Sequence, residues 1–263
     1  LVDILHPSIA SDGSATVDPS GIRILVWSAI TLVAFWIGLF YGLCWKRSSW
    51  MRAMAPSSVP KENDVYWCSR NVIGIMHAVV VAALALPAMA ALMAGPDFAK
   101  FGSTCHVGVC LPGLDDLHRH PGFGDFAWCY LCIAFAGLLF TTFTLADIVI
   151  STVHGLATID YVIHHLAFVT AGVMIRMHCM LPFNAAILMA MEASTPFLNY
   201  LLLVRNRGER YSRAALVNGI IFVILFVLLR LGLNTYGVVL LWLYSQSAIP
   251  ASVPYWQGGG LCF

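Results

Sequence analysis

The chain has 263 residues, of which 60% are hydrophobic and only 10% are charged. Soluble domains usually carry about 25% charged residues, so the composition argues against a soluble domain and favours an integral membrane protein. The formal net charge of +1 provides no basic surface for nucleic acid, and we expect no nucleic-acid partner.

The chain begins at Leu1, and the segment Leu1–Gly21 is mixed and polar. It lacks the basic start and apolar centre of a signal peptide. We therefore expect any targeting signal to lie upstream, either in a removed presequence or before an internal start.

Six apolar stretches reach the roughly 20 residues needed to cross a bilayer. Backbone groups in lipid need internal partners, so each stretch is predicted to be a helix. The fold class is thus all-α, a six-helix transmembrane bundle. The stretches are Ile22–Trp45, Trp67–Ala94, Phe126–Ile150, Leu156–Ile175, Leu181–Val204 and Ala214–Tyr244. The last exceeds one crossing, so we expect it to tilt or to break near Gly232 or Gly237.

These helices suggest a division of the chain into four parts. Residues 1–21 form an N-terminal segment, and residues 22–62 form the first transmembrane helix and a basic loop. Residues 63–244 form a five-helix domain that contains a long loop, 95–125. Residues 245–263 form a C-terminal tail without a helix signal. Loops as long as 95–125 usually have a role, so loop 95–125 and tail 248–263 are candidate contacts for other membrane subunits.

Lys and Arg cluster in the first and fifth loops. The first loop carries Lys46, Arg47, Arg52 and Lys61, and the fifth carries Arg205, Arg207, Arg210 and Arg213. The positive-inside rule places these loops on the cytosolic or matrix side and both termini on the opposite side. The expected location is the endoplasmic reticulum or the mitochondrial inner membrane.

Among the eight cysteines, Cys105 and Cys110 stand apart because they lie in loop 95–125. On the outer side of a membrane an oxidising compartment favours a disulfide between them. Free thiols are one alternative and zinc bound with nearby histidines is another, but the spacing matches no standard zinc site. We expect no metal. The pair Cys129 and Cys132 forms a C-x-x-C on a predicted helix, and we interpret both as buried thiols.

Ionisable and amide side chains recur within the predicted helices at i, i+3, i+4 or i+7 spacing, which places them on shared faces. Such residues are costly in lipid and usually face the bundle interior or a cavity. The faces carry Arg70 and His77, with Gly74 between them; Asp147 and His154, with the hydroxyl of Ser151; Asp160 with His164; Tyr161 with His165; Glu192 and Asn199, with the hydroxyl of Thr195; and Arg230 with Asn234.

Ion pairs between these faces are the simplest expectation. Glu192 has Arg70 or Arg230 as candidate partners, and Asp147 has His77, His164 or His165. The alternative is that each polar side chain only joins neighbouring helices by hydrogen bonds of about 1 kcal/mol. Adjacent imidazoles at His164 and His165 also supply an acid, a base or a nucleophile near neutral pH.

Several motifs resemble the TLC domain, named for translocating-chain-associated, longevity-assurance and ceroid-lipofuscinosis membrane proteins. They are Trp67-Cys-Ser-Arg70 with His77-Ala78, then Asp147, Tyr161-Val-Ile-His164-His165-Leu, Glu192-Ala-Ser-Thr-Pro-Phe-Leu-Asn199, Asn218-Gly219, Phe226 and Arg230. The resemblance covers roughly Asn63 to Tyr244, and the motif that starts at Glu192 resembles the small TLC-domain subgroup. It implies a helical bundle around a lipid-accessible cavity.

The resemblance also implies a link to sphingolipid or phospholipid homeostasis, and so an influence on membrane lipid composition. Ceramide synthases of this superfamily use a His-His pair, matched here by His164 and His165, to transfer an acyl group from acyl-CoA to a sphingoid amine. They also carry a His-Asp and a second Asp on the next helix, where this chain has only Glu192.

Three hypotheses follow. The first is a non-catalytic lipid binder, holding a phospholipid or sphingolipid through Arg70, His77, His164, His165, Glu192, Asn199 and Arg230. The second is an N-acyltransferase in which His164, His165 and Asp147 are catalytic. The third is an accessory subunit of a membrane complex.

Overall fold

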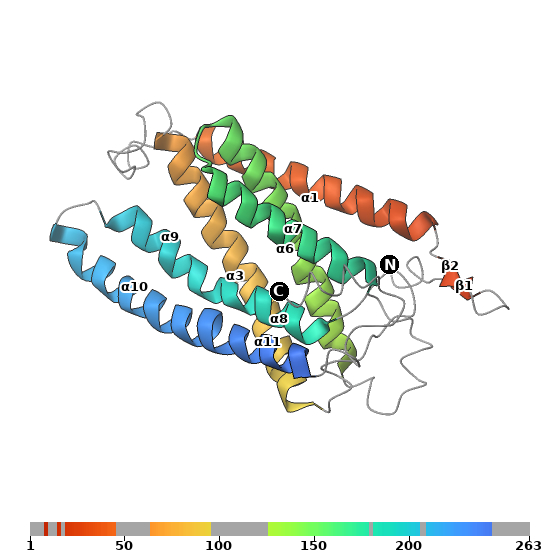
Figure 1. Ribbon diagram of the computed structural model, residues 1–263. Coiled ribbons are helices and arrows are strands. Elements are labelled where there is room, and N and C mark those ends of the chain that lie inside the picture. Colours follow the sequence, from red (N-terminus) through yellow and green to blue (C-terminus); the bar gives the residue numbers. More distant parts are fainter. Residues whose placement is uncertain are drawn as a thin grey trace.

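The computed structural model describes residues 8–9, 15–16, 19–45, 64–95, 126–178, 181–205 and 209–243. The described part is almost wholly helical (Figure 1). The exceptions are two short antiparallel strands, β1 (Ser8–Ile9) and β2 (Ala15–Thr16). The predicted all-α fold is confirmed.

In the described part of the chain four helices come first: α1 (Pro19–Trp45), α3 (Asp64–Ala94), α6 (Ala127–Val153) and α7 (Ile159–His178). A composite helix follows, made of α8 (Pro182–Ala190), the 3₁₀ turn η3 (Met191–Ser194) and α9 (Thr195–Val204). The last is made of the 3₁₀ turn η4 (Glu209–Tyr211), α10 (Ser212–Leu225), the π-helix η5 (Phe226–Leu233) and α11 (Asn234–Leu243).

Five of these helical segments are long and apolar enough to cross a membrane. Within the described residues they are Arg23–Trp45, Val65–Ala94, Trp128–Val153, Pro182–Val204 and Glu209–Leu243. The predicted fourth crossing corresponds to α7, whose apolar portion Ile159–Ile175 is shorter. The whole of α7 has 20 residues, which gives a length of about 30 Å at 1.5 Å per residue. This length equals the thickness of a typical hydrocarbon core.

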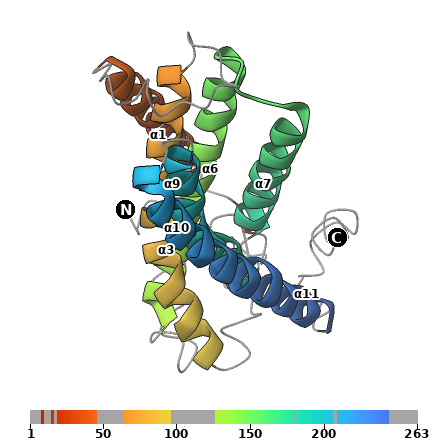
Figure 2. The same cartoon turned by 90° about the vertical axis from the view of Figure 1, so that its left-hand side faces the viewer.

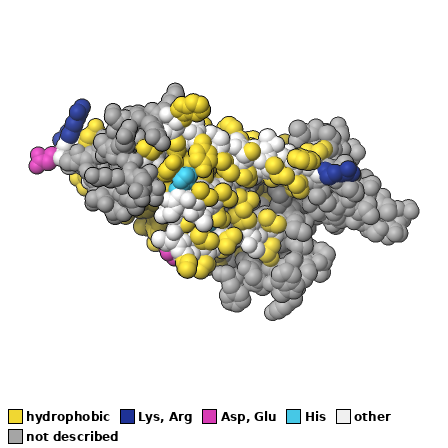
Figure 3. Space-filling view, turned by 90° about the horizontal axis from the view of Figure 1, so that it is seen from above, with side chains coloured by type: hydrophobic (Ala, Val, Ile, Leu, Met, Phe, Trp, Pro, Cys, Tyr) yellow, Lys and Arg dark blue, Asp and Glu magenta, His cyan; other side chains and the backbone are white. Residues whose placement is uncertain are grey.

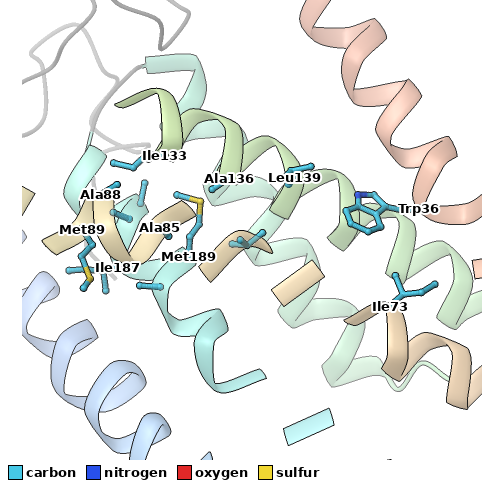
Figure 4. Packing of buried hydrophobic residues seen from close by; sticks show 14 of the residues in the cluster. Trp36, Ile73, Ala85, Ala88, Met89, Ile133, Ala136, Leu139, Ile187 and Met189 are labelled. Atoms are coloured by element: carbon cyan, nitrogen blue, oxygen red, sulfur yellow. The ribbon is translucent and has the colours of Figure 1, made fainter. Parts of the chain in front are cut away.

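Helix α3 lies at the centre of the bundle, in contact with α1, α6, α8 and α9. Its buried face is rich in alanine, including Ala78, Ala82, Ala85 and Ala88. Small side chains let membrane helices approach closely, which explains why α3 accepts several neighbours. Figure 4 shows Ala85, Ala88 and Met89 packed with residues such as Ile187 and Met189.

The outer surface is apolar. The last composite helix alone exposes Leu216, Ile220, Val223, Leu228 and Leu231, each at least half exposed. In Figure 3 hydrophobic side chains cover the middle of the molecule, whereas Lys and Arg appear at its two ends. A surface of this kind fits hydrocarbon between two polar boundaries, and the protein is a multi-pass membrane protein.

A tilt or a break near Gly232 or Gly237 was expected in the final helix; the helix is continuous, so there is no break, and the tilt stays a prediction. Instead the helix widens into the π-helix η5, which contains Gly232. Gly237 lies beyond η5 in α11, where an added Cβ would lie 2.7 Å from Cδ1 of Ile187. The missing side chain therefore lets α11 approach α8.

Candidate functional site

The turn between α6 and α7 brings two polar faces together. Gly155 follows α6 with a φ of 63°, a left-handed conformation that favours glycine and ends the helix. The backbone N–H of Leu156 then donates to the carbonyl of Ser151, 2.7 Å away, and the chain reverses. Helix α7 returns along α6, as Figure 2 shows, and its first turns lie beside the last turns of α6.

Asp147 is the centre of the first polar cluster. Arg70 binds it in a bidentate manner, with Nε 2.7 Å from Oδ1 and Nη2 3.2 Å from Oδ2. The hydroxyl of Tyr161 donates to Oδ2, and Ser151 Oγ lies 3.4 Å from Oδ1. The Arg70 guanidinium also lies over the Tyr161 ring, 4.6 Å from its centroid. The Asp147 side chain is only 8% exposed, so several donors stabilise its charge away from water.

His165 has both ring nitrogens near polar groups of the protein. Its Nδ1 lies 3.0 Å from the carbonyl oxygen of Tyr161, and because a carbonyl only accepts, Nδ1 carries the proton. Its Nε2 lies 3.5 Å from Oδ2 of Asp147. Of the three histidines suggested as partners of Asp147, the structure brings His165 to it.

His164 points elsewhere, as a rotation of 100° per residue requires. Its ring is exposed and contacts those of His165 and Phe168. Within the described residues no hydrogen bond or ion pair holds it, and no carboxylate orients it. The two histidines therefore occupy unlike environments.

A second cluster joins the two irregular helical segments. Nη2 of Arg230, in η5, lies 3.6 Å from Oε1 of Glu192, in η3. Arg230 also donates two hydrogen bonds, from Nε to Ser194 Oγ and from Nη2 to Thr195 Oγ1, and each has a donor–acceptor distance of 3.1 Å. The structure thus pairs Glu192 with Arg230, one of its two candidate partners, whereas Arg70 binds Asp147.

Pro196 accounts for the irregularity of η3. It has no N–H to donate to the Glu192 carbonyl, as the helical ladder would require. The N–H of Thr195 bonds that carbonyl instead, in the tighter 3₁₀ pattern. This local tightening holds Glu192, Ser194 and Thr195 opposite Arg230.

His77 belongs to neither cluster. It is 2% exposed and stacks on Phe143, with ring centroids 3.9 Å apart, while Trp36 meets it edge-on. Its Nε2 has no hydrogen-bond partner in the described part of the chain. The structure thus does not bring His77 to Asp147, and aromatic packing occupies its ring instead.

His154 was predicted on the same helical face as Asp147. It lies just beyond the end of α6, in a group of aromatic side chains. Its ring stacks on Tyr66 at 3.8 Å, and Nε2 lies 3.1 Å from the hydroxyl of Tyr41. Burial lowers the pKa of His154, so the neutral imidazole is favoured. This group ties the ends of α1, α3 and α6 together.

Both charged clusters line one cavity of about 320 Å³. This volume is at the lower end of the roughly 300–1,000 Å³ typical of ligand pockets. The walls come from α3, α6, α7, the composite helix α8–α9 and η5. The polar lining residues include Arg70, Asn71, His77, Thr144, Asp147, His164, His165, Glu192, Thr195, Asn199 and Arg230. All seven residues predicted to bind lipid line this cavity.

Some expectations concern other parts of the chain. Cys105, Cys110, loop 95–125 and tail 248–263 lie outside the described residues, apart from Gly95. Cys44, Cys68, Cys129 and Cys132 are not in disulfides. No cluster of three His, Cys, Asp or Glu side chains suited to a metal occurs where the structure is described.

The chain matches the TLC domain family over residues 69–262. This match covers more than half of the chain, so the protein belongs to the TLC domain family, a lipid-related family of membrane proteins. The resemblance inferred from the motifs is thereby confirmed. No curated protein and no solved structure matches the chain.

Proposed function

We propose that this protein binds the polar end of a membrane lipid in the cavity between its helices and does not catalyse acyl transfer. The observation that carries the proposal is the unlike setting of the two adjacent histidines. A catalytic histidine needs a free ring nitrogen for the reacting atom and a third group that orients the ring. Each of the two residues lacks one of these.

His165 has an orienting partner, but both of its ring nitrogens already lie near polar groups of the protein. Nδ1 is bound to the Tyr161 carbonyl, and Nε2 is directed toward Asp147. Asp147 is itself engaged by Arg70 and Tyr161, so its charge is already compensated. These contacts support a structural role for His165, as a brace between α6 and α7.

His164 has the opposite arrangement. Its ring lines the cavity and is free of hydrogen bonds to other described residues, but no carboxylate is positioned to orient it. Such an imidazole suits a hydrogen bond to a ligand better than general-base catalysis.

The first experiment compares two substitutions to the same residue. Leu198 lines the cavity, whereas Leu166 is 48% exposed on the surface of α7. We expect the purified wild type and Leu166→Trp to retain lipid detectable by native mass spectrometry, and Leu198→Trp to lose most of it. Equal lipid content in all three would refute binding in this cavity.

The second experiment addresses catalysis. The wild type and a His164→Ala/His165→Ala variant are incubated with labelled palmitoyl-CoA and a sphingoid base. We expect no product above background from either. Product formed by the wild type and lost in a folded double variant would establish an acyltransferase in place of our proposal.

A role as an accessory subunit rests on loop 95–125 and tail 248–263, beyond the described residues. Purification under mild conditions, which the lipid measurement requires, also reports any subunit that copurifies.

A further inference from the structure

We infer that the cavity recognises an uncharged polar head, one that carries both hydrogen-bond donors and acceptors, such as a hydroxyl or an amide. The inference rests on the proposed function and names the class of lipid. It follows from which polar groups in the cavity are already satisfied by the protein and which are not.

The fixed charges in the cavity compensate one another. Arg70 is bound to Asp147, and Arg230 lies 3.6 Å from Glu192, so two positive charges meet two negative ones. The four residues with fixed charges therefore contribute no net charge to the described lining. A buried charge is stable only when it is paired, so a charged head would lack a partner here.

An anionic head would also face a direct penalty. To reach Arg230, a phosphate would have to approach the Glu192 carboxylate, which already lies beside that guanidinium. To reach Arg70, it would approach Asp147, which accepts from two of the guanidinium nitrogens. Like charges in a medium of low dielectric constant repel strongly.

The polar groups left over are neutral. The side chains of Asn199 and His164 line the cavity, and neither forms a hydrogen bond with another residue that the structure describes. A carboxamide offers an acceptor and two donors, and a neutral imidazole offers one of each. Since α9 carries Asn199 and α7 carries His164, a small polar head could bridge the two helices.

Gly74 on α3 makes room for this amide. A Cβ at position 74 would lie 2.6 Å from Nδ2 of Asn199, closer than real Cβ contacts. The absence of a side chain at Gly74 therefore sets where the Asn199 amide lies. Because the obstructed atom is the end of a side chain, Gly74→Ala would turn the amide away and leave the ion pairs in place.

The test uses photoactivatable probes with the same acyl chains and different heads. The protein is placed in phosphatidylcholine nanodiscs with photoactivatable diacylglycerol, phosphatidate or phosphatidylcholine, and labelled cavity peptides are quantified. We expect diacylglycerol to label most strongly. Asn199→Leu should weaken that labelling about fivefold, the factor that corresponds to one hydrogen bond of about 1 kcal/mol.

The matched control is Asn218→Leu. The Asn218 amide donates to the Ala214 carbonyl within α10 and does not line the cavity, so its loss should not change labelling. Gly74→Ala should act like Asn199→Leu, which provides a second variant if Asn199→Leu folds poorly.

The outcomes separate the inference from the proposed function. Stronger labelling by phosphatidate or phosphatidylcholine would overturn the neutral head and leave lipid binding intact. Diacylglycerol labelling unchanged in both Asn199→Leu and Gly74→Ala would overturn recognition through Asn199. Cavity labelling by none of the probes, in a protein that also retains no lipid, would overturn the proposed function itself.

Discussion

Arg70 and Asp147 are 77 residues apart in the chain, yet they form an ion pair with Nε 2.7 Å from Oδ1. Arg70 lies near the start of α3 and Asp147 near the end of α6. Because these two helices pack against each other, the pair joins the central helix to its neighbour at one end of the bundle.

Removing one partner of this pair should destabilise the protein strongly. Asp147→Asn leaves the Arg70 charge without a carboxylate in a largely buried position, and we expect a loss of about 3–5 kcal/mol in the free energy of unfolding. Thermal unfolding in detergent can be followed with a thiol-reactive dye, since Cys68 and Cys129 are fully buried.

Asp160→Asn is the matched control because Asp160 is exposed in the first turn of α7. Replacing both partners, as in Arg70→Met/Asp147→Leu, should cost less than Asp147→Asn alone, since no unpaired charge remains. If Asp147→Asn unfolds at the same temperature as the Asp160→Asn control, the ion pair contributes little to stability.

Sequence patterns predicted the faces of these helices better than the contacts between them. The i, i+4 spacing identified both Asp147 and Arg70, but it assigned Arg70 to Glu192 as one of two possibilities. Position along the helices was a usable signal: adjacent antiparallel helices place the start of one and the end of the next at the same depth. Arg70 and Asp147 satisfy that condition.

Other features depend on three-dimensional packing and could not be predicted. His77 looked like a partner for Asp147, but Phe143 and Trp36 cover its ring, and this contact requires three different helices. The π-helix around Arg230 was also missed, because no proline marks it and Gly232 suggested a break. The 3₁₀ turn at Glu192, by contrast, follows from Pro196.

The ion pair between Glu192 and Arg230 should also contribute to stability, but less than the pair between Arg70 and Asp147. Arg230 keeps hydrogen bonds to Ser194 and Thr195 when the carboxylate is neutralised, so Glu192→Gln should be milder than Glu192→Ala. A double-mutant cycle with Glu192→Gln and Arg230→Gln should give an interaction energy within about 0.5–3 kcal/mol. Additive effects of the two substitutions would show that the ion pair contributes nothing measurable.

Replacing His164 and replacing His165 should change the stability of the protein by different amounts, because the two side chains make different contacts. His165→Ala removes the hydrogen bond to the Tyr161 carbonyl and the contact with Asp147, and we expect a loss of about 1–3 kcal/mol. His164→Ala removes an exposed ring and should stay within about 0.5 kcal/mol. Thermal unfolding of both variants in one detergent measures the difference, and the reverse order would contradict the assignment of His165 as the brace.

The pair Cys105 and Cys110 remains a prediction for loop 95–125. If this loop faces an oxidising compartment, the two thiols should be joined, and the short loop would give a stabilisation near the low end of the usual range, about 2 kcal/mol. Peptide mass spectrometry without reduction decides between the two states. Cys44, Cys68, Cys129 and Cys132 serve as internal controls, since the structure has none of them in a disulfide. Two alkylated cysteines at 105 and 110 would exclude the bond.

Topology is the last prediction, and it depends on whether α7 crosses the membrane. With α7 counted, the chain crosses six times and both termini lie on one side; without it, they lie on opposite sides. Helix α7 runs back along α6 for about 30 Å, so we expect it to cross. The basic residues Arg205, Arg210 and Arg213 should then face the cytosol or matrix, and both termini should face the other side.

Labelling of single cysteines in sealed vesicles tests this topology. The cysteines are introduced at Ser14, Glu209 and Ser252 into a cysteine-depleted chain and are labelled with an impermeant maleimide. Ser14 and Ser252 should react from the same side and Glu209 from the other. Reaction of Ser14 and Ser252 from opposite sides would mean that α7 does not cross the membrane.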